Sequence, residues 1–367
     1  MGAFYSFDHK SSSLITNYSA SIALSLGGTL FEEFTLSHSI DNHNKGVSVI
    51  SESVCQKVMG RSNAFTAVEN VFSAMANNTA YNFPVIREAI GHEDALYGFK
   101  SGFDRDGMVL GLKSGGYWPG NINKDLTNHQ STVILFDPDT GKLKSLVGGN
   151  YLTAIRTAAS SAVSIAHLAR KDAKVLGMVG AGHQSTFQLR AAVEQRNFEK
   201  VIAWNLHPEK LANLAAVAQK LNLPFESVTR EELCAQADVI ITITSAFEAL
   251  IDADWIKAGT HIACMGTDTK GKQEVDSKLL SKATVFTDEL AQSISIGEAQ
   301  HAIAANLIQQ ADITPIGDVI NGTKTGRCSE EEITLFDGTG VGLQDLAVAS
   351  VAAELAEDQK LATYFNL

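Results

Sequence analysis

The sequence predicts an α/β protein in which one region contains a parallel sheet and another contains helices beside an antiparallel sheet. Beyond residue 174, short apolar runs alternate with helical patterns, which is typical of a parallel sheet covered by helices. Between residues 81 and 148, strand-like segments follow one another without helices, which indicates an α+β region. A glycine-rich turn directly follows the first strand of the parallel region. These three observations fix the fold class.

The glycine turn lies in residues 174–205, KVLGMVGAGHQSTFQLRAAVEQRNFEKVIAWN. Strand, glycine turn, helix and strand in this order form the dinucleotide-binding unit of a Rossmann-type domain. Gly180 permits the tight turn, and Gly182 lets backbone N–H groups approach a pyrophosphate at the helix N-terminus. An ordinary βα turn is the alternative, but the elements on both sides favour a nucleotide site. The turn residues expected to contact the nucleotide are Gly180, Ala181, Gly182, His183, Gln184 and Ser185.

Length and composition exclude several classes of protein. With 367 residues, of which 45% are hydrophobic and 19% charged, the chain is long enough for two domains. No apolar run approaches the length that spans a membrane. The net charge of −12 argues against nonspecific binding to nucleic acid or to an anionic membrane. The four cysteines lack metal-type spacing, so we expect free thiols, no metal site and a cytoplasmic location.

Residues 1–46 are rich in Ser, Asn and His, and we expect an extension outside the main fold. The segment 1–6 fits the loose myristoylation pattern, but the pattern is short and chance explains it better. The apolar run at 22–26 is too broken for a signal peptide.

The first structured region begins with a strand at 47–50. Helices are expected at 52–59 and 63–75, since apolar residues recur on one face and serines precede the first helix. Five strands follow, with a hairpin turn at 137–141 between the last two. The expected strands are 81–86, 95–101, 108–114, 132–136 and 142–148.

A helix of small residues at 151–170 leads into the parallel region. After the glycine turn we expect helices at 208–221 and 230–237 and strands at 225–228, 239–244, 262–266 and 284–287. A strand at 333–336 and an alanine-rich helix at 344–359 are expected to return to the first region. The predicted domains are therefore 47–150 with 333–367, and 151–332.

In an open α/β sheet, ligands bind at the carboxyl ends of the strands. Thr244 and Ser245 end one strand, so their hydroxyls are expected to line the dinucleotide, although solvated polar residues are an equal alternative. Gly266 ends another strand and leads into Thr267-Asp268-Thr269-Lys270. Asp268 therefore lies where a general acid/base is needed, while ordinary turn chemistry is the alternative.

The first region offers cations for a carboxylate substrate. Arg87, Lys100 and Lys113 lie on predicted strands, and Arg156 lies on the linking helix. A guanidinium binds a carboxylate bidentately, although surface charge is the usual role of Lys and Arg. Residues 114–121, SGGYWPGN, are expected to form a loop that closes over this pocket.

Several blocks in order resemble the ornithine cyclodeaminase/mu-crystallin family over about residues 47–360. They are LGLKSGGYWPGN, YLTAIRTAASSAV, VGAGHQS, ADVIITITSA, MGTDTKGKQEV, DELAQS and ITLFDGTGVGLQDLAVA. The resemblance implies a Rossmann-type NAD(P)-binding domain paired with a substrate and dimerisation domain, and a homodimer. Family members include cyclodeaminases that recycle bound NAD, reductases of ketimines and other imino acids, alanine dehydrogenase and some opine dehydrogenases.

The resemblance also assigns roles to residues. Asp268 matches the catalytic acid/base, and Lys113 matches the lysine near the substrate carbonyl or imine carbon. Arg156 matches a carboxylate-binding arginine, and Arg87 matches another within a less distinctive stretch.

Two departures within the resemblance bear on the reaction and the cofactor. The segment after Lys113 is less polar than in the cyclodeaminases and looks like the reductase and dehydrogenase branches. At the end of the second nucleotide strand, an acidic residue favours NAD and an arginine favours NADP. Asn205 is neutral and Leu206 replaces the arginine, so we expect NAD(H), with NADP(H) as the alternative.

These observations predict an NAD(P)H-dependent reductase of an α-imino acid, or the reverse amino acid dehydrogenase. A cyclodeaminase with tightly bound NAD, an opine dehydrogenase and a non-catalytic binding protein are the alternatives. If Arg87, Lys100, Lys113, Arg156 and His129 all face inward, the pocket is strongly cationic and suits a substrate with a second acidic group, such as iminosuccinate or an opine precursor. The helices of the first region cover one face of its sheet, so we expect the other face to pack in a homodimer.

Overall fold

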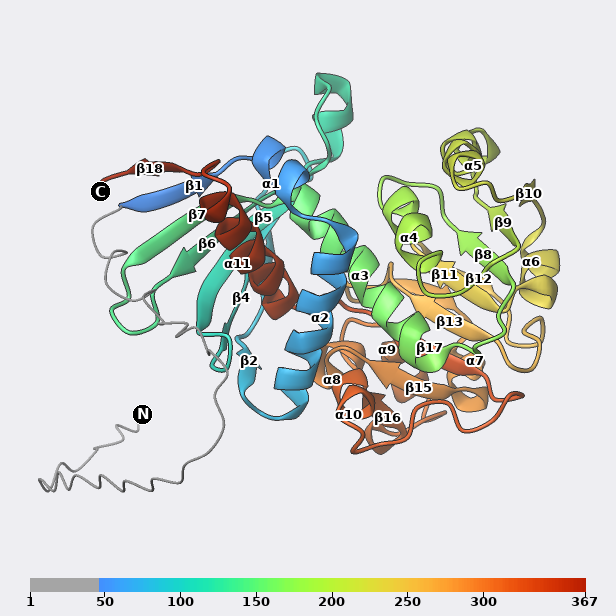
Figure 1. Ribbon diagram of the computed structural model, residues 1–367. Coiled ribbons are helices and arrows are strands. Elements are labelled where there is room, and N and C mark those ends of the chain that lie inside the picture. The colour runs from blue at the N-terminus through green and yellow to red at the C-terminus, as the bar shows by residue number, and fades with distance from the viewer. Residues whose placement is uncertain (1–45) are drawn as a thin grey trace, which may run out of the picture. The chain divides into compact units, whose positions relative to one another are not determined.

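The computed structural model describes residues 46–367, which contain two large sheets (Figure 1). The expected extension at 1–46, with its myristoylation pattern and broken apolar run, lies outside the described residues apart from Gly46. Among the described helices, none is long and apolar enough to cross a membrane.

The first sheet has the order β18-β1-β7-β6-β5-β4-β2, with β3 paired to β4. Its pairs are antiparallel as predicted, except that β1 runs parallel to β7. The strands are β1 (Val47–Ile50), β2 (Ala80–Asn82), β3 (Ile86–Ala89), β4 (Leu96–Asp104), β5 (Val109–Tyr117), β6 (His129–Phe136), β7 (Leu143–Gly148) and β18 (Thr363–Phe365).

Helices cover one face of this sheet. They are α1 (Glu52–Val58), which Ser51 caps, α2 (Arg61–Ala76) and α11 (Gly342–Asp358). In Figure 1, α11 crosses the sheet beside β4 and β5. The approach is close because Gly102 and Gly111 lack side chains where Leu343 and Leu346 of α11 pack.

The hairpin turn between β6 and β7 forms as expected. Asp137 accepts hydrogen bonds from the N–H groups of Asp139 and Thr140, and Gly141 has φ of +70°.

The expected loop at 114–121 is wrong in its first half, because residues 114–117 continue β5 and pair with both β4 and β6. Gly115 and Gly116 permit this pairing: a Cβ on Gly116 would lie 1.9 Å from the carbonyl oxygen of Leu96. The segment that leaves the sheet begins at Trp118 and contains the 3-10 helix η2 (Pro119–Lys124).

The second sheet is parallel, with the order β10-β9-β8-β11-β13-β17-β15-β16. The burial of every residue in β11, β13 and β17 shows that both of its faces are covered. The strands are β8 (Val175–Val179), β9 (Lys200–Trp204), β10 (Phe225–Ser227), β11 (Val239–Thr242), β13 (His261–Cys264), β15 (Thr284–Thr287), β16 (Ile313–Pro315) and β17 (Thr334–Asp337).

The placement of the last of these strands corrects a prediction. We expected the strand at 333–336 to return to the first region, but β17 lies between β13 and β15 in the parallel sheet. The reason is that Leu335 and Phe336 point to opposite faces and both are fully buried, which only a sheet covered on both sides provides. The following helix, α11, does return to the first sheet.

Helix α3 (Asn150–Leu168) links the two sheets. Small residues allow close packing, so nearly its whole length is buried. The other helices are α4 (Ser185–Ala192), α5 (Leu211–Lys220), α6 (Arg230–Gln236), α7 (Ser277–Lys282), α8 (Leu290–Ser293), α9 (Ala299–Ala304) and α10 (Ile316–Ile320). The sequence did not predict α7 to α10, or the two-stranded sheet of β12 (Phe247–Ile251) and β14 (Gln273–Val275).

Candidate functional site

The glycine turn lies between β8 and α4. In the parallel sheet β8 has β9 on one side and β11 on the other, so the turn lies where the strand order changes direction. Gly180 has φ of +106°, and a Cβ there would lie 2.6 Å from the carbonyl oxygen of Ile243. A Cβ on Gly182 would meet nothing within 4 Å. The turn is therefore tight at Gly180 and open at Gly182, as a bound pyrophosphate requires.

Backbone donors face this open space. Within residues 46–367, no acceptor lies within hydrogen-bond distance of the N–H groups of Gly182, His183 and Gln184. Ser185 begins α4 and donates its hydroxyl to the carbonyl of Gly182, which holds the turn in shape. Free N–H groups at a helix N-terminus fit a dinucleotide diphosphate.

Asn205, at the end of β9, is held by the turn. Its Oδ1 accepts a hydrogen bond from the N–H of Ala181 at 2.9 Å, and its Nδ2 donates to the carbonyl of His207. Leu206 next to it is 73% exposed. The amide thus fixes the turn, and the end of β9 carries neither the carboxylate nor the arginine that reads the ribose.

Thr244, Ser245 and Gly266 lie at the neighbouring strand ends. The N–H and hydroxyl of Thr244 donate to Oε1 of Glu274 at 2.6 and 2.8 Å, and the N–H of Gly266 donates to Oε2 at 2.9 Å. Ser245 is exposed. The structure therefore brings these residues together, with a buried carboxylate behind them that the sequence analysis missed.

A second buried carboxylate supports the first. Glu298 accepts hydrogen bonds from the backbone of Glu274 and Val275 and from the hydroxyl of Thr267. Burial, followed by the charge of Glu274, raises the pKa of Glu298 to about 8. Burial likewise raises the pKa of Glu274. The two carboxyls hold the segment after β13, which carries Asp268.

Asp268 follows β13 and lies between two cations. Its Oδ1 is 2.8 Å from Nζ of Lys272, and its Oδ2 is 3.3 Å from Nη1 of Arg87. Burial alone raises the pKa of Asp268, but the charges of Lys272, Arg87 and Lys100 outweigh it and hold the pKa well below its usual range. The side chain is 35% exposed, so an ionised and accessible carboxylate stands at this strand end.

Arg87 reaches Asp268 from the first sheet. It lies on β3, which pairs with β4 opposite Gly98, and a side chain on Gly98 would collide with the backbone of β3. Its Nη1 also donates to the hydroxyl of Thr269 at 3.2 Å. The first sheet and the end of β13 thus share one site.

Lys113 and Arg156 meet at Asp345, a buried residue of α11 that was not predicted. Nζ of Lys113 lies 2.7 Å from Oδ2 of Asp345, and Nε of Arg156 donates to Oδ1 at 2.9 Å. Burial lowers the pKa of Lys113 to about 7, against the opposing charge of Asp345. The charges of Arg156 and Lys113 outweigh burial and lower the pKa of Asp345 to about 2.

Lys100 and His129 are the other two residues that were expected to be cationic in the site, and their surroundings differ. Lys100 donates its ammonium to the carbonyl of Gly340 at 2.6 Å, and its pKa is lowered by burial and then by Arg156. Burial, followed by the charge of Lys113, lowers the pKa of His129 to about 3. His129 is therefore neutral near pH 7 and adds no charge to the site.

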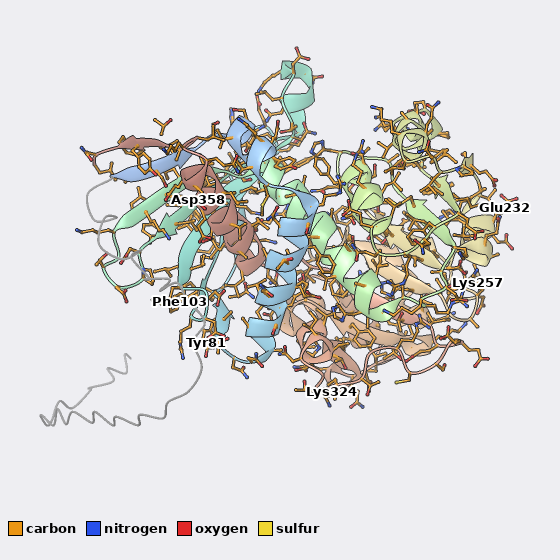
Figure 2. The ribbon with its side chains drawn as sticks, viewed as in Figure 1. Tyr81, Phe103, Glu232, Lys257, Lys324 and Asp358 are labelled. Atoms are coloured by element: carbon orange, nitrogen blue, oxygen red, sulfur yellow. The ribbon has the colours of Figure 1, made fainter. Side chains whose placement is uncertain are left out.

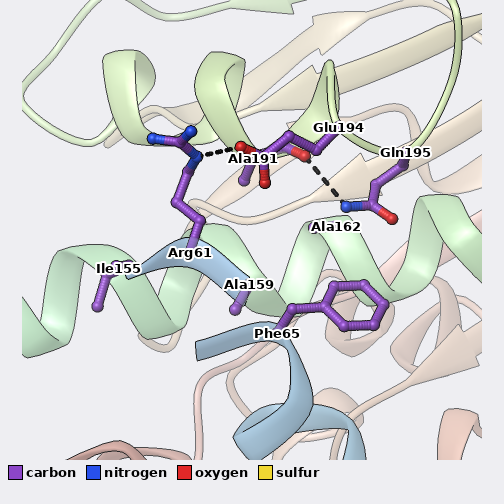
Figure 3. A pocket seen from close by; sticks show the side chains of 8 residues that line it. All are labelled: Arg61, Phe65, Ile155, Ala159, Ala162, Ala191, Glu194 and Gln195. Atoms are coloured by element: carbon purple, nitrogen blue, oxygen red, sulfur yellow. Dashed lines mark hydrogen bonds and ion pairs between the residues drawn. The ribbon is translucent and has the colours of Figure 1, made fainter. Parts of the chain in front are cut away.

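A small cavity between α2, α3 and α4 lies apart from these groups (Figure 3). Arg61 and Glu194 form an ion pair at its mouth. Its volume of about 10 Å³ holds at most one water molecule, so it is not a substrate site.

The comparisons with known proteins identify the family of this chain and match its fold. The model of the ornithine cyclodeaminase/mu-crystallin family matches residues 53–360. The iminosuccinate reductase of Paracoccus denitrificans is 60% identical over 86% of this chain and 98% of its own length. Its crystal structure in complex with NAD+ superimposes with a TM-score of 0.85 over 88% of this chain and 100% of that chain, at 58% identity. The alanine dehydrogenase of Archaeoglobus fulgidus is 32% identical over 84% of this chain and 94% of its own. The chain belongs to the ornithine cyclodeaminase/mu-crystallin family.

Proposed function

We propose that this protein is an NAD(H)-dependent reductase of an α-imino acid, which also runs in reverse as an amino acid dehydrogenase. One observation carries the proposal: Arg87 from the first sheet meets Asp268 at the carboxyl end of β13. A carboxylate-binding cation of the first sheet and a candidate proton-transfer group thus lie together, at a strand end of the sheet that carries the glycine turn.

Each side chain has a proposed role. Arg156 and Arg87 bind the α-carboxylate, and Lys113 positions and polarises the reacting carbon. The amides of Gly182, His183 and Gln184 bind the diphosphate, with Thr244, Ser245 and Gly266 along the nucleotide. NADH, when bound, supplies a hydride to the substrate.

The ionised state of Asp268 suits an iminium substrate. Because its pKa is held low, the carboxylate accepts a hydrogen bond from the iminium N–H and stabilises the positive charge. In the reverse direction the same carboxylate accepts a proton from the substrate ammonium. In reduction the iminium brings one proton, and the second proton, which converts the product amine into the ammonium, passes from solvent to the nitrogen through the same carboxylate.

For the substrate we propose iminosuccinate or a similar imino acid. The support is the activity printed for the relative that is 60% identical and the similarity along nearly its whole length. Two observations support NAD(H) as the cofactor. The similar structure contains NAD+. Positions 205 and 206, which follow β9, are Asn and Leu rather than arginine. NADP(H) is the alternative that the assay compares.

We also propose a homodimer with its interface on the first sheet. The face opposite α11 carries a stripe of apolar side chains, none fully buried, on β4, β5 and β6: Phe99, Phe103, Leu110, Leu112, Ile134 and Phe136. In Figure 2, Phe103 and its neighbour Tyr81 lie at the end of this sheet. Packing two such faces around a twofold axis buries both.

The division into domains is part of this proposal. Residues 47–150 and the returning C-terminal segment form the substrate and dimerisation domain, and the parallel sheet forms the NAD-binding domain, which includes β17. A cytoplasmic location is supported by the four unpaired cysteines, three of which are buried.

Net oxidation of NADH tests the proposed reaction. Oxaloacetate or pyruvate with ammonia forms imines in solution, and reduction lowers the nicotinamide absorbance. The assay uses a panel of 2-oxo acids at saturating concentration, each with ammonia or an amine, and both NADH and NADPH. If the nicotinamide absorbance does not change with any of them, the reductase proposal fails. Ammonia release from ornithine or lysine without net change in nicotinamide identifies a cyclodeaminase instead.

A further inference from the structure

Lys100 and Lys113 lie directly opposite each other on β4 and β5. Opposite residues of an antiparallel pair have Cβ atoms about 5 Å apart and point to the same face. Helix α11 covers this face of the sheet. Gly102 and Gly111 lie two residues from Lys100 and Lys113 on the same strands, so they are on the same face, and they lie against leucine side chains of α11. Both ammonium groups therefore enter the site from one side.

The two lysines differ in their partners. Lys113 has the carboxylate of Asp345 at 2.7 Å. Within residues 46–367, no carboxylate lies within 4.0 Å of the Lys100 ammonium, whose hydrogen-bond acceptor is the carbonyl of Gly340. Two like charges directly opposite each other are destabilising, and only one of this pair is neutralised.

Lys100 also lies beside Arg156. Gly340, which accepts its hydrogen bond, is so close to Arg156 that a Cβ there would lie 2.7 Å from Nη1. The pKa of Lys100 is lowered by burial first and by Arg156 second. Lys100 and Arg156 therefore both lie against Gly340.

The charges in the site do not balance without a substrate. Five side chains are cationic, namely Arg87, Lys100, Lys113, Arg156 and Lys272, and their ion-pair partners are Asp268 and Asp345. With the charge of its iminium counted, a substrate with one carboxylate leaves three positive charges in excess. A substrate with two carboxylates leaves two, and Lys100 is the cation whose ammonium has no carboxylate partner.

We propose that Lys100 binds the second carboxylate of a dicarboxylic imino acid and so determines specificity for it over a monocarboxylic one. This inference rests on the proposed imino acid reduction. Arg156 and Arg87 then serve the α-carboxylate common to both substrate classes, and Lys100 serves the group that distinguishes them.

Lys100→Met tests this assignment, since methionine keeps most of the stem and removes the charge. The ratio of kcat/KM for oxaloacetate with ammonia to that for pyruvate with ammonia is expected to fall by about 10- to 100-fold, mainly through KM. Lys100→Arg keeps a cation and is expected to retain most of the ratio. Lys142→Met, on the exposed hairpin turn, serves as the matched control and is expected to leave both values unchanged.

A purely structural role, in which Lys100 only anchors Gly340, lowers both values together and leaves their ratio unchanged. That result overturns the inference while the reductase proposal stands. Binding supplies a second readout that needs no turnover. With NADH present, which cannot react with an amino acid, calorimetry is expected to show Lys100→Met weakening aspartate binding by about 10-fold or more relative to alanine. Equal weakening of both ligands contradicts the inference, whether or not the wild type reduces imines.

Discussion

The carboxylate of Asp345 on α11 lies 2.7 Å from the ammonium of Lys113 on β5, and both side chains are almost fully buried. The same carboxylate accepts a hydrogen bond from Arg156. Asp345 therefore holds Lys113 and Arg156, the two cations proposed to bind the substrate, at a fixed separation, and its charge raises the pKa of Lys113 against the effect of burial.

Asp345→Asn is expected to shift the alkaline limb of the kcat/KM profile to lower pH. The carboxylate raises the pKa of Lys113, which burial has lowered to about 7. Removing the charge lowers this pKa further, so the ammonium is lost at lower pH. The measurement is kcat/KM from pH 5.5 to pH 9, with the exposed Asp139→Asn as control. An unchanged alkaline limb contradicts the role given to Lys113.

Asp268→Asn is expected to lower kcat for imine reduction by about 10² to 10⁴ while the protein still binds NADH. The amide is nearly isosteric but neutral, so it neither stabilises an iminium charge nor accepts a proton. Steady-state kinetics and a fluorescence titration with NADH measure the two quantities separately. Asp254→Asn changes an exposed carboxylate paired with Lys282 and serves as control. A kcat within a few-fold of wild type excludes Asp268 from the chemistry.

Glu298→Gln is expected to flatten the dependence of stability on pH. The pKa of Glu298 is raised to about 8 in the folded state, above its ordinary value of 4.5. The folded state thus binds the proton more tightly, and this contribution to the free energy of unfolding is lost as pH rises through 8. Glutamine mimics the protonated acid. Thermal denaturation between pH 5 and pH 9 measures the slope, and an identical slope in both proteins refutes the assignment.

Phe99→Glu is expected to dissociate the proposed homodimer. Phe99 belongs to the apolar stripe on the face opposite α11, so a charge there opposes burial against a second copy. Light scattering is expected to give twice 39.3 kDa for the wild type and a mass near 39.3 kDa for the variant. Lys57→Glu, also exposed but on α1, tests whether any added negative charge has this effect. A wild-type mass near 39.3 kDa at micromolar concentration rules out the dimer.

The fold class and most elements were predictable because their signals are local. The glycine turn and the short apolar runs lie within single segments, and the family resemblance is confirmed. The placement of β17 was not predictable in this way. The apolar residues Ile333, Leu335 and Phe336 indicate a strand, but nothing within 333–337 specifies which sheet it joins.

The residues of the candidate site also divide into those that the sequence could predict and those that it could not. Asp268 was predictable because it directly follows a buried strand, and Lys272 lies in the same turn. Asp345 and Glu274 were missed because each is a single acidic residue within an ordinary element, and its partners lie on other elements. Only the folded chain shows that their carboxylates organise the strand ends and the cations.

Transfer of deuterium from labelled cofactor tests the central claim most directly. The enzyme is incubated with oxaloacetate, ammonia and NADH that carries deuterium at both positions of C4, and the amino acid product is analysed by mass spectrometry. The account predicts aspartate with one deuterium on its α-carbon, and no such product with Asp268→Asn in the same time. Aspartate without deuterium, or oxidation of NADH without any amino acid, would contradict it.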